Sequence, residues 1–118
     1  MKIVVPVKTN KENPAVSPLF GKAKWFAFID QDGNIDIRQN QAHGGGEVIR
    51  WFLNEGVDVV VFQKMGGTPY KMLSQIPNMT LFHSGYDRIV LSDLIQKLKD
   101  NKLQKVDDSN INEIMSKA

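Results

Sequence analysis

Two histidines and no cysteine set the metal chemistry open to this 118-residue chain. Thiolates hold most structural zinc ions and iron–sulfur clusters, so the missing cysteine excludes thiolate-held metals, disulfides and catalysis by a thiol. His43 and His83 remain as candidate metal ligands. Because two histidines alone cannot complete a closed tetrahedral zinc site, a metal-containing ligand would need support from methionine, lysine charge or backbone amides.

A glycine run follows the first histidine and precedes a helical pattern. It consists of Gly44, Gly45 and Gly46. Exposed amides at the start of a helix attract anions, and Lys22 and Lys64 would add positive charge. The chain lacks both Gly-x-x-x-x-Gly-Lys-Ser/Thr and a Gly-x-Gly-x-x-Gly after its first strand, so the pattern favours an anion over a nucleotide. The alternatives are a flexible turn for the glycines and an incidental surface position for His43.

Two further residues, His83 and Met65, have side chains that can act as metal ligands. His83 ends an apolar segment, where a hydrogen-bonded structural histidine is more typical than a ligand. Met65 precedes Gly66 and offers a soft thioether. A methionine that fills a gap in the core is the simpler interpretation of Met65.

Catalytic patterns are poorly represented. The chain has no Gly-x-Ser-x-Gly motif. Its first strand carries no acidic residue that would hold magnesium for a nuclease. We therefore predict no catalytic residue, and a phosphate-ester enzyme is the least favoured hypothesis.

Hydrophobic patterning predicts the elements that position these residues. Strands are expected at 3–8, 25–30, 35–39, 57–62 and 79–83, with helices after the last three strands. Thr68 is the expected N-cap of the second helix and Pro69 its first residue. The Asp32-Gly33 pair predicts a hairpin. The order βββαβαβα predicts a three-layer α/β/α fold with a mixed five-stranded sheet.

This topology gathers the candidate residues at one edge of the sheet. Strands one, three, four and five run the same way, and open α/β sheets bind ligands beyond the carboxyl ends of such strands. The loops at this edge comprise residues 8–10, 20–22, 43–46, 64–67 and 83–85. The expected binding residues are His43, the three glycines after it, Phe20, Gly21, Lys22, Met65, Gly66 and Gly67.

The first strand and the loop after it carry two unusual signals. Pro6 cannot donate a ladder hydrogen bond, which predicts a bulge or one locally unpaired side at that point. Residues 9–22 form a long loop, and compact domains seldom keep such loops without a function.

The composition limits the classes of protein to which this chain can belong. Hydrophobic residues make up 42% and charged residues 24%, as in an ordinary globular domain. The 15 basic and 13 acidic residues balance too closely to indicate nucleic-acid binding. No apolar run reaches the length of a membrane span, so we expect a cytoplasmic protein with no membrane partner. The domain is expected to cover residues 1–106, with a polar tail at 107–118 that contains a weak helix at 111–115.

Several segments together resemble a known family. They are Met1-Lys2-Ile3-Val4-Val5-Pro6, Val16-Ser17-Pro18-Leu19-Phe20-Gly21-Lys22-Ala23-Lys24-Trp25-Phe26, His43-Gly44-Gly45-Gly46, Gly56-Val57-Asp58-Val59-Val60-Val61 and Met65-Gly66-Gly67-Thr68-Pro69. The chain resembles the dinitrogenase iron–molybdenum cofactor biosynthesis domains of the NifX and NafY type, also found at the C-terminus of NifB. The Ser-Pro-x-Phe-Gly-(Arg/Lys)-Ala segment is the most specific part.

The resemblance implies a ribonuclease-H-like fold without nuclease activity. It also implies a small carrier for an anionic metal–sulfur cluster, such as the iron–molybdenum cofactor or a precursor, exchanged with a donor or acceptor protein. The family loop usually reads Ser-Pro-His-Phe-Gly-Arg-Ala, whereas this chain has Leu19 and Lys22 at the histidine and arginine positions. The alternative is a regulatory or protein-interaction module of the same fold that no longer binds a cluster.

Overall fold

A computed structural model describes residues 1–117 and contains a six-stranded mixed sheet of order β3-β2-β1-β4-β5-β6. The strands are β1 (Ile3–Val7), β2 (Trp25–Ile29), β3 (Ile35–Gln39), β4 (Val59–Phe62), β5 (Thr80–His83) and β6 (Gln104–Lys105). The helices are α1 (Gly45–Asn54), α2 (Gly67–Ser74), α3 (Leu91–Lys99) and α4 (Ile111–Lys117). Strands β1, β4 and β5 run parallel, and β2 is antiparallel to both β1 and β3. The predicted α/β class and the directions of the first five strands are confirmed.

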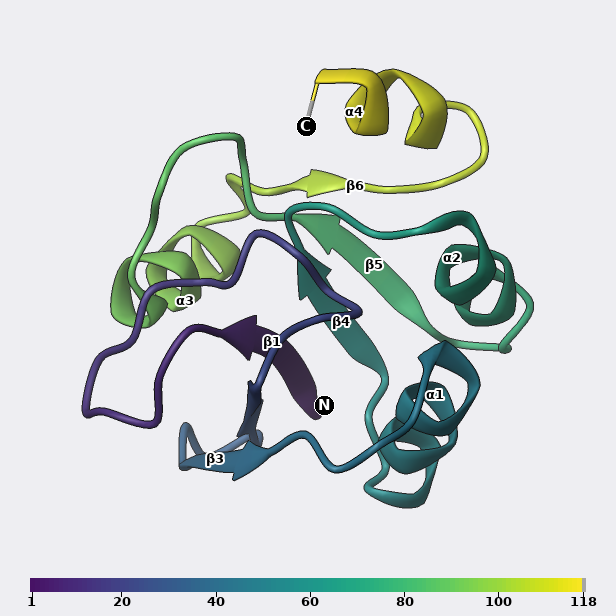
Figure 1. The fold of residues 1–118 in the computed structure, drawn as a ribbon. Helices are drawn as coiled ribbons and strands as arrows, with labels where there is room; N and C mark the ends of the chain where they lie inside the picture. Colours follow the sequence, from purple (N-terminus) through teal and green to yellow (C-terminus); the bar gives the residue numbers. More distant parts are fainter. Residues whose placement is uncertain (118) are drawn as a thin grey trace.

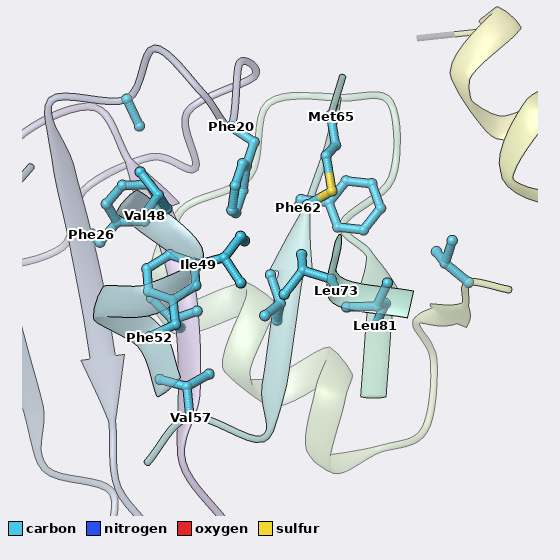
Figure 2. Packing of buried hydrophobic residues seen from close by; sticks show 14 of the residues in the cluster. Phe20, Phe26, Val48, Ile49, Phe52, Val57, Phe62, Met65, Leu73 and Leu81 are labelled. Carbon is cyan, nitrogen blue, oxygen red and sulfur yellow. The ribbon is translucent and has the colours of Figure 1, made fainter. Parts of the chain in front are cut away.

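Side chains that alternate along the strands build a core on each face of the sheet. Val4 and Val60 face one core, and Val5 and Val61 face the other. Helices α1 and α2 cover the first face and α3 covers the second (Figure 1). Figure 2 shows the first core, where aromatic rings from β2, α1 and the loop before β2 interlock.

The sheet has one strand more than the sequence predicts. Strand β6 pairs antiparallel with β5, with Lys105 opposite Phe82 and Gln104 opposite His83. Both of its residues are polar and exposed, so no hydrophobic alternation marks this strand in the sequence. Its backbone pairing with the edge of β5 depends on the tertiary fold.

The segment expected as a polar tail contains α4. Ile111 and Ile114 are buried in the same core as Leu73 of α2 and Leu81 of β5. Tyr70 of α2 also donates a hydrogen bond of 2.6 Å to an Asp108 carboxylate oxygen. This segment therefore packs onto the face that α1 and α2 cover.

The predicted start of α2 is wrong by two residues. Gly66 is the N-cap, and the helix begins at Gly67 with no side-chain capping bond. Thr68 and Pro69 therefore lie inside the first turn. Pro69 remains acceptable there, because the first-turn amides of a helix have no intrahelical acceptor.

The Pro6 signal is explained by a change of neighbour along β1. The parallel register with β4 covers Ile3 and Val4 only. Beyond it, the Ser17 amide donates to the Pro6 carbonyl at 2.8 Å, and the Lys8 amide donates to Ala15 at 2.9 Å. The long loop thus returns beside the end of β1, so the side of β1 that faces β4 has left that strand at Pro6, while the other side stays paired with β2.

Candidate functional site

Two loops at the carboxyl edge of the sheet are joined by backbone hydrogen bonds. The Phe20 amide donates to the Lys64 carbonyl at 3.0 Å, and the Lys64 amide donates to the Pro18 carbonyl at 3.1 Å. Leu19 and Lys64 form an isolated parallel bridge. Residues far apart in the sequence are therefore held in register beyond the ends of β1 and β4. These are the strands between which the sheet order reverses, which is where open α/β sheets bind ligands.

An aromatic anchor fixes the first of these loops. Phe20 is 1% exposed. Its ring makes edge-to-face contacts with Phe26 at 5.6 Å and Phe52 at 5.8 Å, and Figure 2 shows it reaching into the core from the loop. Phe20 was predicted as a binding residue, but its side chain lies in the core. Its contribution to the site is to position the backbone on either side of it.

The joined loops enclose a small open cavity, which we call the loop pocket. Its volume is about 260 Å³, and its lining residues are Leu19, Phe20, Gly21, Lys22, Lys64, Met65 and Gly66. Five of the predicted binding residues, Phe20, Gly21, Lys22, Met65 and Gly66, are among them. The fold thus brings together much of the site that the sequence predicts.

The loop pocket is positively charged. Lys22 and Lys64 are both exposed, and no acidic residue lines the pocket. Within residues 1–117 the ion pairs join Arg38 to Asp36 and Glu55, and Lys117 to Glu113. Neither pocket lysine is therefore neutralised by a carboxylate, which makes this surface attractive to an anion.

Met65 lies between the pocket and the core. Its backbone amide donates to the Met115 sulfur at 3.3 Å. Its side chain is 5% exposed and points toward Phe62 in the core (Figure 2). The geometry corresponds to a gap-filling methionine that contributes backbone to the pocket wall.

The second candidate region is the glycine loop, residues 43–46. Gly44 is the N-cap of α1 and adopts φ 103° and ψ 170°, a conformation essentially restricted to glycine. The exposed His43 donates its backbone amide to a Glu47 carboxylate oxygen at 2.6 Å. A protein carboxylate therefore already occupies the N-terminal region of this helix, and its charge opposes an incoming anion.

The glycine loop and the loop pocket are neighbours separated by one side chain. A Cβ added to Gly45 would lie 3.4 Å from Pro69 Cγ, and one added to Gly66 would lie 3.7 Å from Pro69 Cδ. The Pro69 ring of α2 thus lies against both loops. The glycine loop contributes no lining residue to the loop pocket.

His83 is held inside the protein. Its side chain is 3% exposed, its Nε2 contacts the Gln63 carbonyl at 2.9 Å, and its Nδ1 accepts the Gly85 amide at 3.3 Å. An accepting Nδ1 leaves the proton on Nε2, which donates to Gln63. Burial lowers the pKa of His83 below its ordinary value. Both ring nitrogens are therefore engaged, and the Nε2 bond supports Gln63, the residue before Lys64.

A larger cavity beside α1 was not predicted from the sequence. It has a volume of about 770 Å³ between the end of β3 and the exposed face of α1. Its lining residues are Arg38, Gln39, Gln41, Ala42, Glu47, Arg50, Trp51 and Asn54. The adjacent Arg50 and Trp51 were the available signal, but the sequence does not show that the end of β3 lies opposite them.

Across residues 1–117, no three side chains of the His, Asp or Glu type form a group that could hold a metal ion. None of the helices described over this range has the length and hydrophobicity to cross a membrane.

Comparison with known proteins identifies relatives of the whole fold. The family model for the dinitrogenase iron–molybdenum cofactor matches residues 1–101. A search of curated proteins gives no match. The solved structure of the apo form of the orange protein from Desulfovibrio gigas has a TM-score of 0.76 and 15% identity over 89% of this chain and 92% of that chain.

Two further solved structures are similar. A protein described as a candidate NifB from Thermotoga has a TM-score of 0.74 and 19% identity over 88% of this chain and 91% of its own. One described as a candidate dinitrogenase from Methanocaldococcus jannaschii has a TM-score of 0.69 and 16% identity over 90% and 94%. At these identities the likeness establishes the shared fold.

Proposed function

The chain belongs to the dinitrogenase iron–molybdenum cofactor family, and from this we propose that it carries an anionic metal–sulfur cluster or its precursor. The proposed binding site is the loop pocket. The observation that carries the proposal is the pair of lysines, Lys22 and Lys64, brought together at a pocket with no acidic lining residue.

The chemistry of the pocket suits such a cargo. A preformed cluster brings its own sulfides, so it needs positive charge and hydrogen-bond donors more than a full set of protein ligands. Lys22 and Lys64 supply the charge, and the exposed backbone at Gly21 and Gly66 permits close approach. The open pocket leaves the cargo accessible to a donor or acceptor protein.

Leu19 is the position at which this chain departs from the family loop. Its side chain is 42% exposed and lines the loop pocket. A histidine at this position, as in the family loop, would therefore face the same pocket. We propose that cluster binding here depends on charge and amide groups to a greater extent than in a protein with that histidine.

His43 is the histidine that we assign to the cargo. It is exposed and lies on the loop across Pro69 from the pocket. A cluster that extends past Pro69 would meet its imidazole. The proposal does not use His83, because both of its ring nitrogens already have partners. Transfer of an intact cluster requires no catalytic residue, so we propose a non-catalytic role.

Anaerobic uptake of tetrathiomolybdate tests the proposal. We expect the full chain to retain molybdenum through gel filtration and to shift the visible spectrum of the anion. The double variant Lys22→Glu/Lys64→Glu should bind about tenfold more weakly or less, because both attractive contacts become repulsive. Lys99→Glu on α3 is the matched control and should bind like the native chain.

Two further variants define the site. Leu19→His should increase uptake, and His43→Ala should decrease it. If the native chain retains no molybdenum and Leu19→His retains none either, the carrier proposal is wrong. If uptake is unaffected by His43→Ala, the assignment of that histidine is wrong.

The second candidate function is a protein-interaction module without cargo. The exposed Leu19 at the mouth of the pocket favours it, because an apolar side chain there suits a protein contact better than an anion. A stable partner recovered from anaerobically purified, metal-free protein, and lost with Leu19→Asp, would support this function over carriage.

A further inference from the structure

Strand β3 forms the long open edge of the sheet. It lies at one end of the strand order, and the opposite edge is the two-residue β6. An exposed edge strand presents unpaired amide and carbonyl groups that can pair with another chain. The side chains of β3 determine whether such pairing is blocked or is favoured in one register.

The register with β2 determines which backbone groups of β3 face outward. Residues 24 and 40 share a hydrogen bond, as do residues 30 and 34, on the same antiparallel register. Because hydrogen-bonded and non-hydrogen-bonded pairs alternate in an antiparallel ladder, Asp36 and Arg38 bond to β2. Ile35, Ile37 and Gln39 therefore direct their amides and carbonyls away from the sheet.

Charge selects one register for a second copy of this strand. Antiparallel pairing through the outward groups must place Ile35, Ile37 and Gln39 opposite one another. Centring the pair on Ile37 puts Asp36 of each copy opposite Arg38 of the other. A shift by one hydrogen-bonded pair in either direction instead places Asp36 opposite Asp36 or Arg38 opposite Arg38, and like charges directly opposite are destabilising.

The apolar side chains of β3 fit the same arrangement. Ile35 is 47% exposed, and Ile37 is only partly buried at the margin of the second core. A pair centred on Ile37 places the Ile37 side chains of the two copies opposite each other and Ile35 of each copy opposite Gln39 of the other, all on one face. Pairing would thus cover apolar surface that residues 1–117 leave exposed.

We propose that two copies of this chain associate through β3, antiparallel and centred on Ile37, to form one continuous sheet. Charged residues on an edge strand commonly prevent such association. The Asp-x-Arg pattern of β3 permits association instead, because in an antiparallel pair each Asp36 lies opposite Arg38 of the other copy. Within one copy Arg38 bonds to Asp36 at 2.7 Å and also pairs with Glu55, so association exchanges one carboxylate partner for an equivalent one.

Sedimentation of the full chain between about 10 µM and about 1 mM tests the proposal, because micromolar to millimolar contacts are populated in this range. We expect a reversible dimer. Asp36→Lys and Arg38→Glu should each weaken it about tenfold or more, since each change places like charges opposite one another twice. Asp32→Lys in the nearby hairpin turn is the matched control and should not change association.

Mixing the two variants provides the decisive result. In a heterodimer of the Asp36→Lys and Arg38→Glu chains, both cross-strand pairs are again attractive. The mixture should dimerise like the native chain although neither variant does so alone. A native chain that is monomeric at about 1 mM overturns the proposal. So does a mixture that remains monomeric, or single variants that dimerise normally.

Amide hydrogen exchange locates the contact residue by residue. The amides of Ile35, Ile37 and Gln39 should become protected as concentration rises. Those of Asp36 and Arg38 should be protected throughout, because they bond to β2. Dimerisation without protection of the first three amides would place the interface elsewhere and overturn the proposal. None of these residues lines the loop pocket, so the result is independent of cluster binding.

Discussion

The loop pocket and the glycine loop lie on either side of Pro69, yet they differ in how they meet an anion. The loop pocket carries two lysines without carboxylate partners. The glycine loop has more glycines and a helix start, but Glu47 bonds to its His43 amide. The comparison teaches that glycines and a helix start do not by themselves create a positive surface, because Glu47 places a carboxylate beside them. The two lysines without carboxylate partners are the reason that we propose the loop pocket as the anion site.

The two regions also use their key residues differently. The loop pocket depends on a buried aromatic ring, Phe20, and its Gly21 has no restricted conformation. The glycine loop depends on backbone conformation at Gly44. Mutations should therefore affect one region through packing and the other through backbone strain.

The largest expected effect is loss of the aromatic anchor. Phe20→Ala should lower the free energy of unfolding by about 3–5 kcal/mol, because it leaves a cavity between Phe26 and Phe52. Denaturant unfolding measures this change. Leu19→Ala is the control and should stay within about 0.5 kcal/mol, since Leu19 is exposed. A loss below about 1 kcal/mol for Phe20→Ala would show that the loop is held by its backbone bonds alone.

A smaller effect separates the glycines of the two regions. Gly44→Ala should cost about 1–3 kcal/mol, because its φ of 103° is strained for any residue with a Cβ. Gly21→Ala should be within about 0.5 kcal/mol, since no atom lies within 4 Å of the added Cβ. Thermal unfolding of both variants provides the measurement. Equal losses at the two positions would show that backbone conformation does not distinguish the glycine loop from the loop pocket.

Removing the carboxylate from the glycine loop sharpens the electrostatic comparison. Glu47→Gln should lower stability by about 0.3–1 kcal/mol through loss of a negative charge at a helix start. It should also allow sulfate to shift the amide resonances of Gly45 and Gly46. The Gly21 resonance should respond to sulfate in both proteins. If Gly45 and Gly46 already respond in the native chain, Glu47 does not block the loop.

The smallest effect concerns acid stability. Burial lowers the pKa of His83 below 6.5, so the unfolded chain binds its proton first as the pH falls. The contribution of His83 is therefore complete above about pH 6.5 and decreases as the pH falls below it. Comparing the unfolding free energy of the native chain and His83→Gln from neutral to acid pH measures this. Identical pH profiles for the two proteins would contradict the role assigned to burial.

Residues with strong local signals allowed much of the fold to be predicted. The alternating and apolar runs predicted five strands and their directions, and Pro6 predicted a bulge or a locally unpaired side on the first strand, which lies where β1 has left β4. The polar β6 and the Gly66 start of α2 were missed. Neither has a local pattern of its own, because β6 depends on an available strand edge and Gly66 caps without a side chain.

The candidate site was predictable to a similar extent. Gly21, Lys22, Met65 and Gly66 follow from the rule that carboxyl ends of parallel strands meet at one edge. The core position of Phe20 and the cavity beside α1 do not follow from it. Both depend on which side chains pack together across distant segments.

The sequence by itself determined the fold class and the exclusion of thiolate chemistry, because these depend on residue types and their periodicity, and its motifs carried the resemblance to the family. Only the tertiary structure decided how charge is distributed. It left Lys22 and Lys64 together without carboxylates, placed Glu47 against the glycine loop, and buried His83 with both nitrogens bonded. Electrostatic interactions depend on distance in space, and spacing along the chain does not supply that distance.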